Sequence, residues 1–214
     1  MMIRDLIKKL MPVAIPRRFI IWSNPGYRNT VSISFDDGPH PIHTPRVLDV
    51  LQKHNVKATF FVLGVHVKKY PDVIIRLLNE GHEIGNHSFT HNGYFKGVLN
   101  SPEKELSLTN KLILDMFGYT IQLYRPPYGI LSIRSLLFCL RNRMTVAKWS
   151  IDSSDYMKKA SIINIVSSCL CKRRYDGDIM LFHDHNDATP LALDELIPFL
   201  KSQGVGFCKI SHLV

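Results

Sequence analysis

Three side chains in the first half of the sequence have the types and spacing of a metal site. The segment HSFTH places His87 and His91 four residues apart, so both imidazoles can face one ion if that turn is helical. Asp37, in the segment SISFDDGPHP, is available as a third ligand. Two histidines, one carboxylate and an open position are typical of hydrolytic metal sites. Zinc is the expected ion, and cobalt or nickel could use the same ligands. The histidine pair alone would be a weak sign, since solvated and core histidines also have this spacing.

Asp36, next to the predicted ligand Asp37, is the candidate general base. A base must lie near the attacking water without being bound to the metal, and a cation on Asp37 would offset the repulsion between the two carboxylates. The segment LYRPPYG supplies Arg125, which could orient Asp36 through a bidentate contact. It also supplies Tyr128, whose backbone N–H could point at a developing oxyanion. Each segment also has a purely structural explanation, because Asp-Gly turns are common and a double proline stiffens a loop.

His183 is the candidate general acid. It follows the apolar run IMLF, which is typical of a buried strand, and a histidine there is well placed to protonate a leaving amine. Asp152, in the segment IDSSDY, is the expected hydrogen-bond partner that would stabilise the imidazolium. Four other histidines lack such company and are not assigned to the site: His66, His82, His185 and His212.

These residues need a scaffold that brings strand ends together, and the remaining sequence predicts one. Strand-like and helix-like runs alternate after residue 29, which favours an α/β fold with a mostly parallel sheet. The predicted strands are 30–35, 57–63, 82–86, 121–125, 143–149, 178–183 and 204–209. The predicted helices lie near 44–54, 71–80, 101–117, 130–141, 158–171 and 189–201. Periodicity does not decide between an open sheet and a barrel, but the candidate polar residues follow strand ends, which in a barrel meet on one face.

The first 27 residues are assigned to a separate basic amphipathic segment, which leaves 28–214 as the catalytic domain. Apolar residues at helical spacing face one way, and Arg4, Lys8 and Lys9 lie on the other side. The segment is too short and too charged to span a bilayer, and no cleavage site typical of a signal peptide follows it. Residues 1–20 therefore form either a helix packed on the domain or one that lies on an anionic membrane surface. We expect a cytoplasmic protein that could associate with membranes.

Charge and cysteine content narrow the classes of protein to consider. The net charge is +9, but the basic residues are spread along the chain without an aromatic-interleaved cluster, so no nucleic-acid partner is expected. The cysteines form no C-x-x-C pair and are predicted to be reduced core residues, which fits a cytoplasmic setting. They are Cys139, Cys169, Cys171 and Cys208.

Taken together, the motifs resemble those of the polysaccharide deacetylase family, carbohydrate esterase family 4, with its chitooligosaccharide deacetylase-like homology domain. The matching segments are SFDDGP, HSFTH, RPPYG, DSSDY and LFH, in the family's order and over about residues 28 to 214. The resemblance implies a distorted (β/α) barrel with about seven parallel strands. It also implies metal-dependent removal of N-acetyl groups from amino sugars.

The resemblance assigns catalytic roles to four residues. Asp36 resembles the catalytic base, and Arg125 resembles the residue that positions it. His183 resembles the catalytic acid, and Asp152 its partner. These roles agree with those inferred above from residue type and position.

The resemblance also covers the metal and the substrate. The residues that resemble the metal triad are Asp37, His87 and His91. Tyr128 resembles the backbone oxyanion donor, and Leu181 the apolar wall that receives the acetyl methyl group. Tyr156 departs from the pattern, because it stands where the family's fourth motif usually ends in tryptophan.

Several functions are compatible with these patterns. The first is an N-deacetylase whose partner is an N-acetylated glycan. Since no extra domain or export signal is obvious, an intracellular role on a glycan precursor is expected. The second is a deformylase of a lipid-linked aminosugar, which the change at Tyr156 keeps open. The others are a catalytically silent sugar-binding protein on the same fold and a membrane-surface adaptor that uses residues 1–20.

Overall fold

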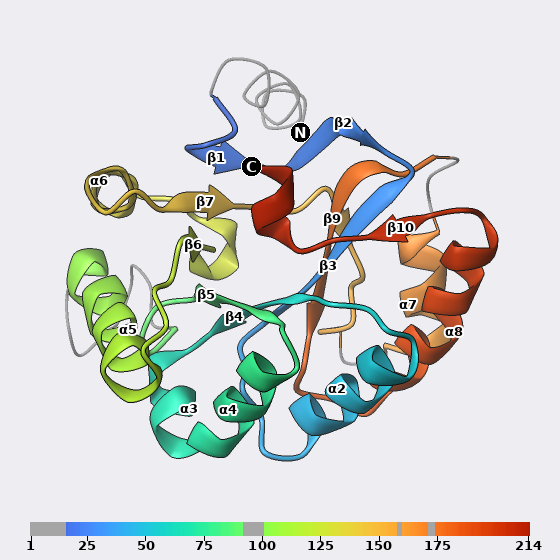
Figure 1. The fold of residues 1–214 in the computed structure, drawn as a ribbon, viewed down its shortest axis with the longest axis horizontal. Helices are drawn as coiled ribbons and strands as arrows, with labels where there is room; N and C mark the ends of the chain where they lie inside the picture. Colours follow the sequence, from blue (N-terminus) through green and yellow to red (C-terminus); the bar gives the residue numbers. More distant parts are fainter. Residues whose placement is uncertain (1–15, 92–100, 158–159, 171–173) are drawn as a thin grey trace.

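One sheet of ten strands organises the fold. The computed structural model describes residues 16–91, 101–157, 160–170 and 174–214. Its strands are β1 Ile20–Ile21, β2 Ser23–Arg28, β3 Thr30–Asp36, β4 Thr59–Val62, β5 Glu83–Asn86, β6 Leu123–Tyr124, β7 Thr145–Ala147, β8 Ile151–Asp152, β9 Asp176–His183 and β10 Gly206–Phe207. The main order is β1-β7-β6-β5-β4-β3-β9-β2, while β10 pairs with β3 and β8 with β9 (Figure 1).

The sheet curves into a nearly closed barrel. Along the path β1-β7-β6-β5-β4-β3-β9, every strand is parallel to its neighbours. Strand β2, at the end of this path, runs antiparallel to β9. The two edge strands are consecutive in the chain and are joined through Trp22, so the backbone itself bridges the seam. This confirms the predicted distorted (β/α) barrel of about seven parallel strands. Residues 20–27, which the sequence assigned to the N-terminal segment, belong to this sheet.

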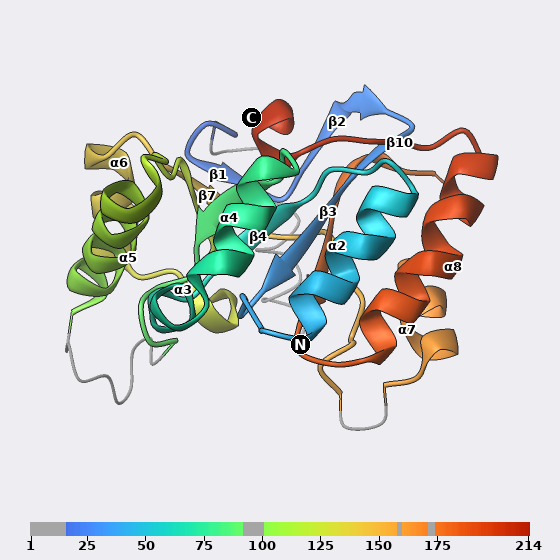
Figure 2. The same cartoon turned by 60° about the horizontal axis from the view of Figure 1, so that its bottom comes forward.

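Seven described helices surround the sheet. They are α2 His43–Lys53, α3 Gly64–Lys69, α4 Pro71–Asn79, α5 Pro102–Phe117, α6 Ile133–Arg141, α7 Ile162–Cys169 and α8 Ala188–Ser202, with the short 3₁₀ turns η1 Pro127–Gly129 and η2 Ile210–Leu213. Figure 2 shows them along the outer side of the sheet. Their ends follow local chemistry: the Ser132 hydroxyl accepts a hydrogen bond from the N–H of Ser135, and α5 stops at Gly118, whose φ of 64° suits glycine.

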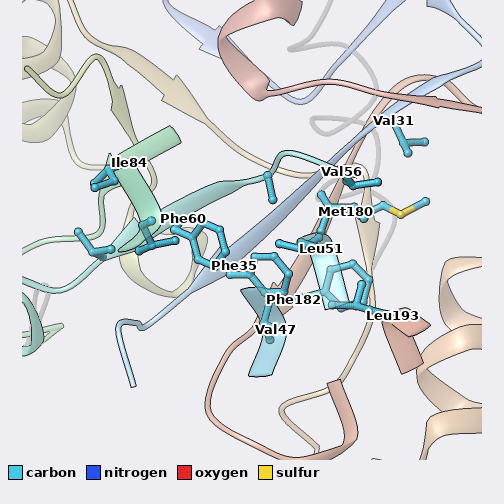
Figure 3. Close-up of a cluster of buried hydrophobic side chains, with 14 of the residues drawn as sticks. Val31, Phe35, Val47, Leu51, Val56, Phe60, Ile84, Met180, Phe182 and Leu193 are labelled. Carbon is cyan, nitrogen blue, oxygen red and sulfur yellow. The ribbon is translucent and has the colours of Figure 1, made fainter. Parts of the chain in front are cut away.

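Hydrophobic side chains fill both sides of the sheet. Outside, the ring of Phe35 stacks on Phe60 at 4.7 Å in a cluster that joins the sheet to the helices (Figure 3). A smaller cluster is formed by Ile21, Phe61, Leu123, Ala147, Ile179, Ile210 and Leu213. Because alternate strand residues point to opposite faces, its strand members line the barrel interior, and η2 packs against them. The polar residues at the carboxyl ends of the strands are held above this packed layer.

Some expectations fall partly or wholly outside the described residues. The predicted amphipathic helix, the segment that follows His91 and Cys171 are among these. Within the described residues, Cys139 and Cys169 are buried and Cys208 is half-buried, and all three are free thiols. No described helix is both long and apolar enough to cross a bilayer.

Candidate active site

A cleft of about 350 Å³ opens at the carboxyl ends of the strands. Eight of the nine predicted site residues line it: Asp36, Asp37, His87, His91, Tyr128, Asp152, Leu181 and His183. The ninth, Arg125, is fully buried beside them. Gly129, Trp149 and Tyr156 complete the lining.

Asp37, His87 and His91 come together as a possible metal site. Oδ1 of Asp37 lies 3.4 Å from Nε2 of His87 and 3.2 Å from Nε2 of His91. This oxygen is buried and has no hydrogen-bond partner among the described residues, as expected for an atom that serves as a metal ligand. Nδ1 of His87 donates a hydrogen bond of 2.8 Å to the carbonyl oxygen of Arg125, which leaves the Nε2 lone pair directed at the centre. These donors fit zinc or a similar divalent ion.

Two of the three ligands have pKa shifts that suit metal binding. Burial raises the pKa of Asp37, but the neighbouring His87 and His91 outweigh it and hold that pKa well below its usual range. Burial lowers the pKa of His91, which favours the neutral imidazole that can bind a metal. For His87, burial lowers the pKa but the charges of Asp36 and Asp37 outweigh it and raise that pKa, so a metal would have to displace its proton.

The turn between His87 and His91 is not helical, although the sequence analysis had assumed a helical turn for the two imidazoles to face one ion. Ser88 and His91 have positive φ angles of 78° and 62°. The hydroxyl of Ser88 accepts a hydrogen bond from the N–H of His91 at 3.0 Å. The buried carboxylate of Glu105, from α5, accepts hydrogen bonds from the N–H groups of Phe89 and Thr90 at 2.8 and 2.7 Å. These contacts replace the helical ladder and turn both imidazoles towards Asp37.

Arg125 holds Asp36, but through one nitrogen. Nη1 of Arg125 donates to Oδ1 of Asp36 at 2.8 Å and to the hydroxyl of Ser34 at 2.9 Å. Its Nε and Nη2 donate to the carbonyl oxygens of Ala147 and Lys148. The predicted bidentate contact is therefore wrong: one fork of the guanidinium binds the acid, and the rest anchors it to β7 and the residue after it. Oδ2 of Asp36 lies 3.7 Å from Nε2 of His87, at the edge of the metal site.

The partner of His183 is Asp155, which corrects the prediction of Asp152. Nδ1 of His183 donates to Oδ1 of Asp155 at 2.8 Å, and the backbone N–H of His183 donates to Oδ2 at 2.7 Å. Oδ1 of Asp152 instead accepts from the N–H of Ser154. Burial lowers the pKa of His183, but the hydrogen bond with buried Asp155 and its charge outweigh this and raise the pKa to about 9. The contact with Asp155 therefore favours the imidazolium form of His183, which can donate a proton.

The remaining lining forms the walls of the cleft. Tyr128 has a positive φ of 56° and is 72% exposed, and its ring lies edge-on to His91 at 4.6 Å. The ring of Tyr156 lies 5.3 Å from that of His183 on the other side. Leu181 is buried at the base of the cleft.

Two further residues near the site were not predicted. Nδ1 of His66, which the sequence left unassigned, donates a hydrogen bond of 2.8 Å to the carbonyl oxygen of Asp37 and steadies the turn. The fully buried carboxylate of Asp184 accepts a hydrogen bond from the hydroxyl of Thr44 and packs so closely under Gly38 that a Cβ there would overlap it. Asp184 directly follows His183 in the sequence, and this position was the feature from which its place near the site could have been predicted.

Comparisons with known proteins show the family to which the chain is similar. Residues 23–143 match the family model described as polysaccharide deacetylase. A peptidoglycan-N-acetylglucosamine deacetylase of Bacillus cereus is 33% identical over 196 residues, which cover 90% of this chain and 70% of the relative. A chitooligosaccharide deacetylase of Sinorhizobium fredii is 35% identical over 189 residues, with 82% of this chain and 87% of the relative covered.

A solved structure extends the likeness to three dimensions. The peptidoglycan deacetylase PdaC of Bacillus subtilis matches with a TM-score of 0.78 at 35% identity, over 89% of this chain and 91% of that one. The full-length PdaC protein is described as a peptidoglycan-N-acetylmuramic acid deacetylase, and the match to the present chain covers 44% of its length.

Proposed function

Because the chain belongs to the polysaccharide deacetylase family, we propose that it is a metal-dependent hydrolase that removes N-acetyl groups from an amino sugar in an oligosaccharide, a polysaccharide or a glycan precursor. The observation that carries the proposal is the unpartnered Oδ1 of Asp37 between two imidazoles, with Asp36 on one side and the protonated His183 in the same cleft.

A divalent cation held by Asp37, His87 and His91 would act as a Lewis acid towards the amide carbonyl and the attacking water. Asp36 takes a proton from that water as general base, since its carboxylate borders the metal site and is oriented by Arg125. Its buried ion pair with Arg125 holds the carboxylate in place beside the metal site.

His183 supplies the second proton transfer. Its Nδ1 is bound to Asp155, so Nε2 carries the proton that passes to the leaving sugar nitrogen. The backbone N–H of Tyr128 stabilises the negative charge that develops on the carbonyl oxygen. Leu181 receives the acetyl methyl group against an apolar surface. A positioned acid or base typically contributes about 10²–10⁴-fold to the rate.

The substrate class follows from what the relatives share. Their names specify N-acetylglucosamine, N-acetylmuramic acid and chitooligosaccharides, and each of these sugars carries an acetamido group. We therefore infer a polymeric or oligomeric acetamido sugar for this chain.

A deformylase is the second candidate, and Tyr156 favours it. This residue is 50% exposed beside the cleft, and the charge of nearby Asp152 raises the pKa of its hydroxyl. The wall beside His183 is therefore more polar than an indole would make it, which suits a formyl group better than a methyl. A catalytically silent sugar-binding protein is disfavoured, because the residues proposed as metal ligands, base and acid all line one cleft.

The test measures released acetate and formate from chitooligosaccharides, peptidoglycan fragments and an N-formylated aminosugar. Metal-stripped protein is compared with and without added zinc. Asp36→Asn serves as the inactive variant, and the exposed Asp49→Asn as its matched control. We expect zinc-dependent release that is lost in Asp36→Asn and kept in Asp49→Asn. Stoichiometric zinc binding without release from any substrate would contradict the proposal, and formate alone would establish the deformylase.

A further inference from the structure

Helix α6 presents an apolar stripe to the outside. Ile133, Leu137 and Leu140 follow one another at positions i, i+4 and i+7, and they are 77%, 43% and 40% exposed. The opposite face holds the buried Ser135 and Cys139. In both overall views α6 lies at the margin of the described fold (Figures 1 and 2). The stripe is therefore an aliphatic surface that no described element covers.

A hollow of about 500 Å³ adjoins the C-terminal end of this stripe, at the end of the barrel opposite the cleft. Leu140 belongs to both the stripe and the hollow. Phe19 and Met144 extend the apolar lining, and Arg18 and Arg143 stand at its edge. No aspartate or glutamate of the described chain lines the hollow.

The positive charge of the hollow is not neutralised locally. Arg18 lies over the ring of Phe19 at 4.6 Å, and neither Arg18 nor Arg143 makes an ion pair within the described residues. Val214 also lines the hollow. Arg134 and Arg141, in contrast, have an acidic neighbour, because their charges help to lower the pKa of Glu103 in α5. Within the described residues, Arg18 and Arg143 therefore remain available to an anionic partner.

We propose that this docking face, defined as the stripe of Ile133, Leu137 and Leu140 with the hollow of Arg18 and Arg143, binds the surface of an anionic lipid bilayer. Lipid phosphates occupy the hollow, and the stripe enters the boundary between headgroups and acyl chains. The net charge of +9 favours the same partner. A second copy of the chain fits less well, since a two-fold contact would bring the arginines of both copies together.

Docking would place the active site next to the membrane. Ile133 begins α6 only four residues after Gly129, which lines the cleft. The stripe thus runs from the rim of the cleft down the side of the barrel. A glycan anchored to a lipid would reach the cleft without the enzyme leaving the surface. The docking itself does not depend on the proposed function.

The experiment is sedimentation of the full chain with vesicles of phosphatidylcholine, with and without phosphatidylglycerol. One variant combines Arg18→Gln with Arg143→Gln, and its control combines Arg28→Gln with Arg174→Gln, which removes the same charge near β2 and β9. A second variant is Leu137→Ser, and its control is Ile163→Ser on the exposed side of α7. Because an arginine near an anionic surface contributes about fivefold to binding, the double arginine variant should bind roughly 25-fold more weakly.

We expect binding only with phosphatidylglycerol, weakened by salt and by both test variants but not by the controls. Hydrolysis of a soluble oligosaccharide and thermal unfolding should be unchanged in Leu137→Ser, which shows that the fold is intact. The proposal is overturned if the wild type does not bind these vesicles. It is also overturned if both test variants bind as the wild type does, because the binding then lies outside the docking face. A concentration-dependent dimer that Leu137→Ser abolishes, without vesicle binding, would also overturn it.

Discussion

The change Asp155→Asn should remove the proton that His183 is proposed to deliver. Asp155 accepts hydrogen bonds from both the Nδ1 and the backbone N–H of His183 and from the hydroxyl of Thr189. An asparagine keeps the volume but loses the negative charge. Burial, which lowers the pKa of His183, is then opposed only by the smaller effects of the Asp36 and Asp37 charges, so the pKa should fall from about 9 towards the ordinary value of 6.5.

The size of the effect follows from the titration. With a pKa of about 9, roughly 0.9 of His183 is protonated at pH 8, and with a pKa near 6.5 the fraction is about 0.03. The rate at pH 8 should therefore fall about 30-fold, while at pH 6 much of the difference should disappear. The expected result is an alkaline limb of kcat/KM that moves from near pH 9 towards pH 6.5.

The assay is the pH profile of acyl release by the zinc-loaded enzyme, with Asp152→Asn as the matched control. Asp152 also lines the cleft, but its carboxylate binds the N–H of Ser154 and not His183, so its loss should leave the alkaline limb in place. A limb that moves in Asp152→Asn and stays in Asp155→Asn would refute this reasoning. By linkage, the pair of Asp155 and His183 stabilises the fold fully below about pH 6.5, and this contribution is lost as the pH rises to about 9.

Two further changes test the buried charges around the cleft. Arg125→Gln leaves Asp36 buried without its counter-ion, so the free energy of unfolding should drop by about 3–5 kcal/mol and activity should be lost. Urea unfolding measures the loss of stability, and acyl release measures the loss of activity. An unchanged urea midpoint would contradict the contribution of the buried ion pair. Burial raises the pKa of Asp184 to about 7, so its carboxyl favours folding only while it is protonated, and wild-type stability should fall as the pH rises from about 4 to about 7. Asp184→Asn, whose carbonyl can still accept from Thr44, should flatten this dependence in metal-free thermal melts; curves of equal slope for the two proteins would count against it.

Much of the site could be predicted because the chain uses parallel strands. Their carboxyl ends must meet at one end of the barrel, so a polar residue just after an apolar run is placed by the fold itself. Asp36, His87 and His183 are each located in this way, and the register of β3 and β9 confirms it by pairing Asp36 with His183.

The partner of His183 could not be fixed in the same way. The segment DSSD offers two acids three residues apart, and both lie close to the cleft. Which one faces the imidazole depends on the turn at Ser154, whose φ is 58°. Periodicity carries no information about such a turn, so it could not have shown that Asp155 and not the predicted Asp152 faces the imidazole.

The missed elements were too short or too atypical for pattern reasoning. Strands β1 and β8 contain two residues each, less than one full alternation. Strand β2 has the sequence SNPGYR and is largely exposed, so it looks like a loop. It forms a strand because its backbone pairs with β9 at the seam. Tertiary pairing, and not local propensity, decides these cases.

The direct pairing of Asp36 with His183 has a consequence for how such an enzyme can change. The two residues sit opposite one another on adjacent strands, so the separation of their backbones is set by the hydrogen-bonded ladder. The surrounding walls, such as Tyr128 and Tyr156, come from loops. Insertions or substitutions in those loops can therefore alter which substrate is admitted while the spacing of the proposed base and acid stays constant. Directed evolution of new glycan specificity on this scaffold should draw its successful variants from the loops and leave β3 and β9 untouched.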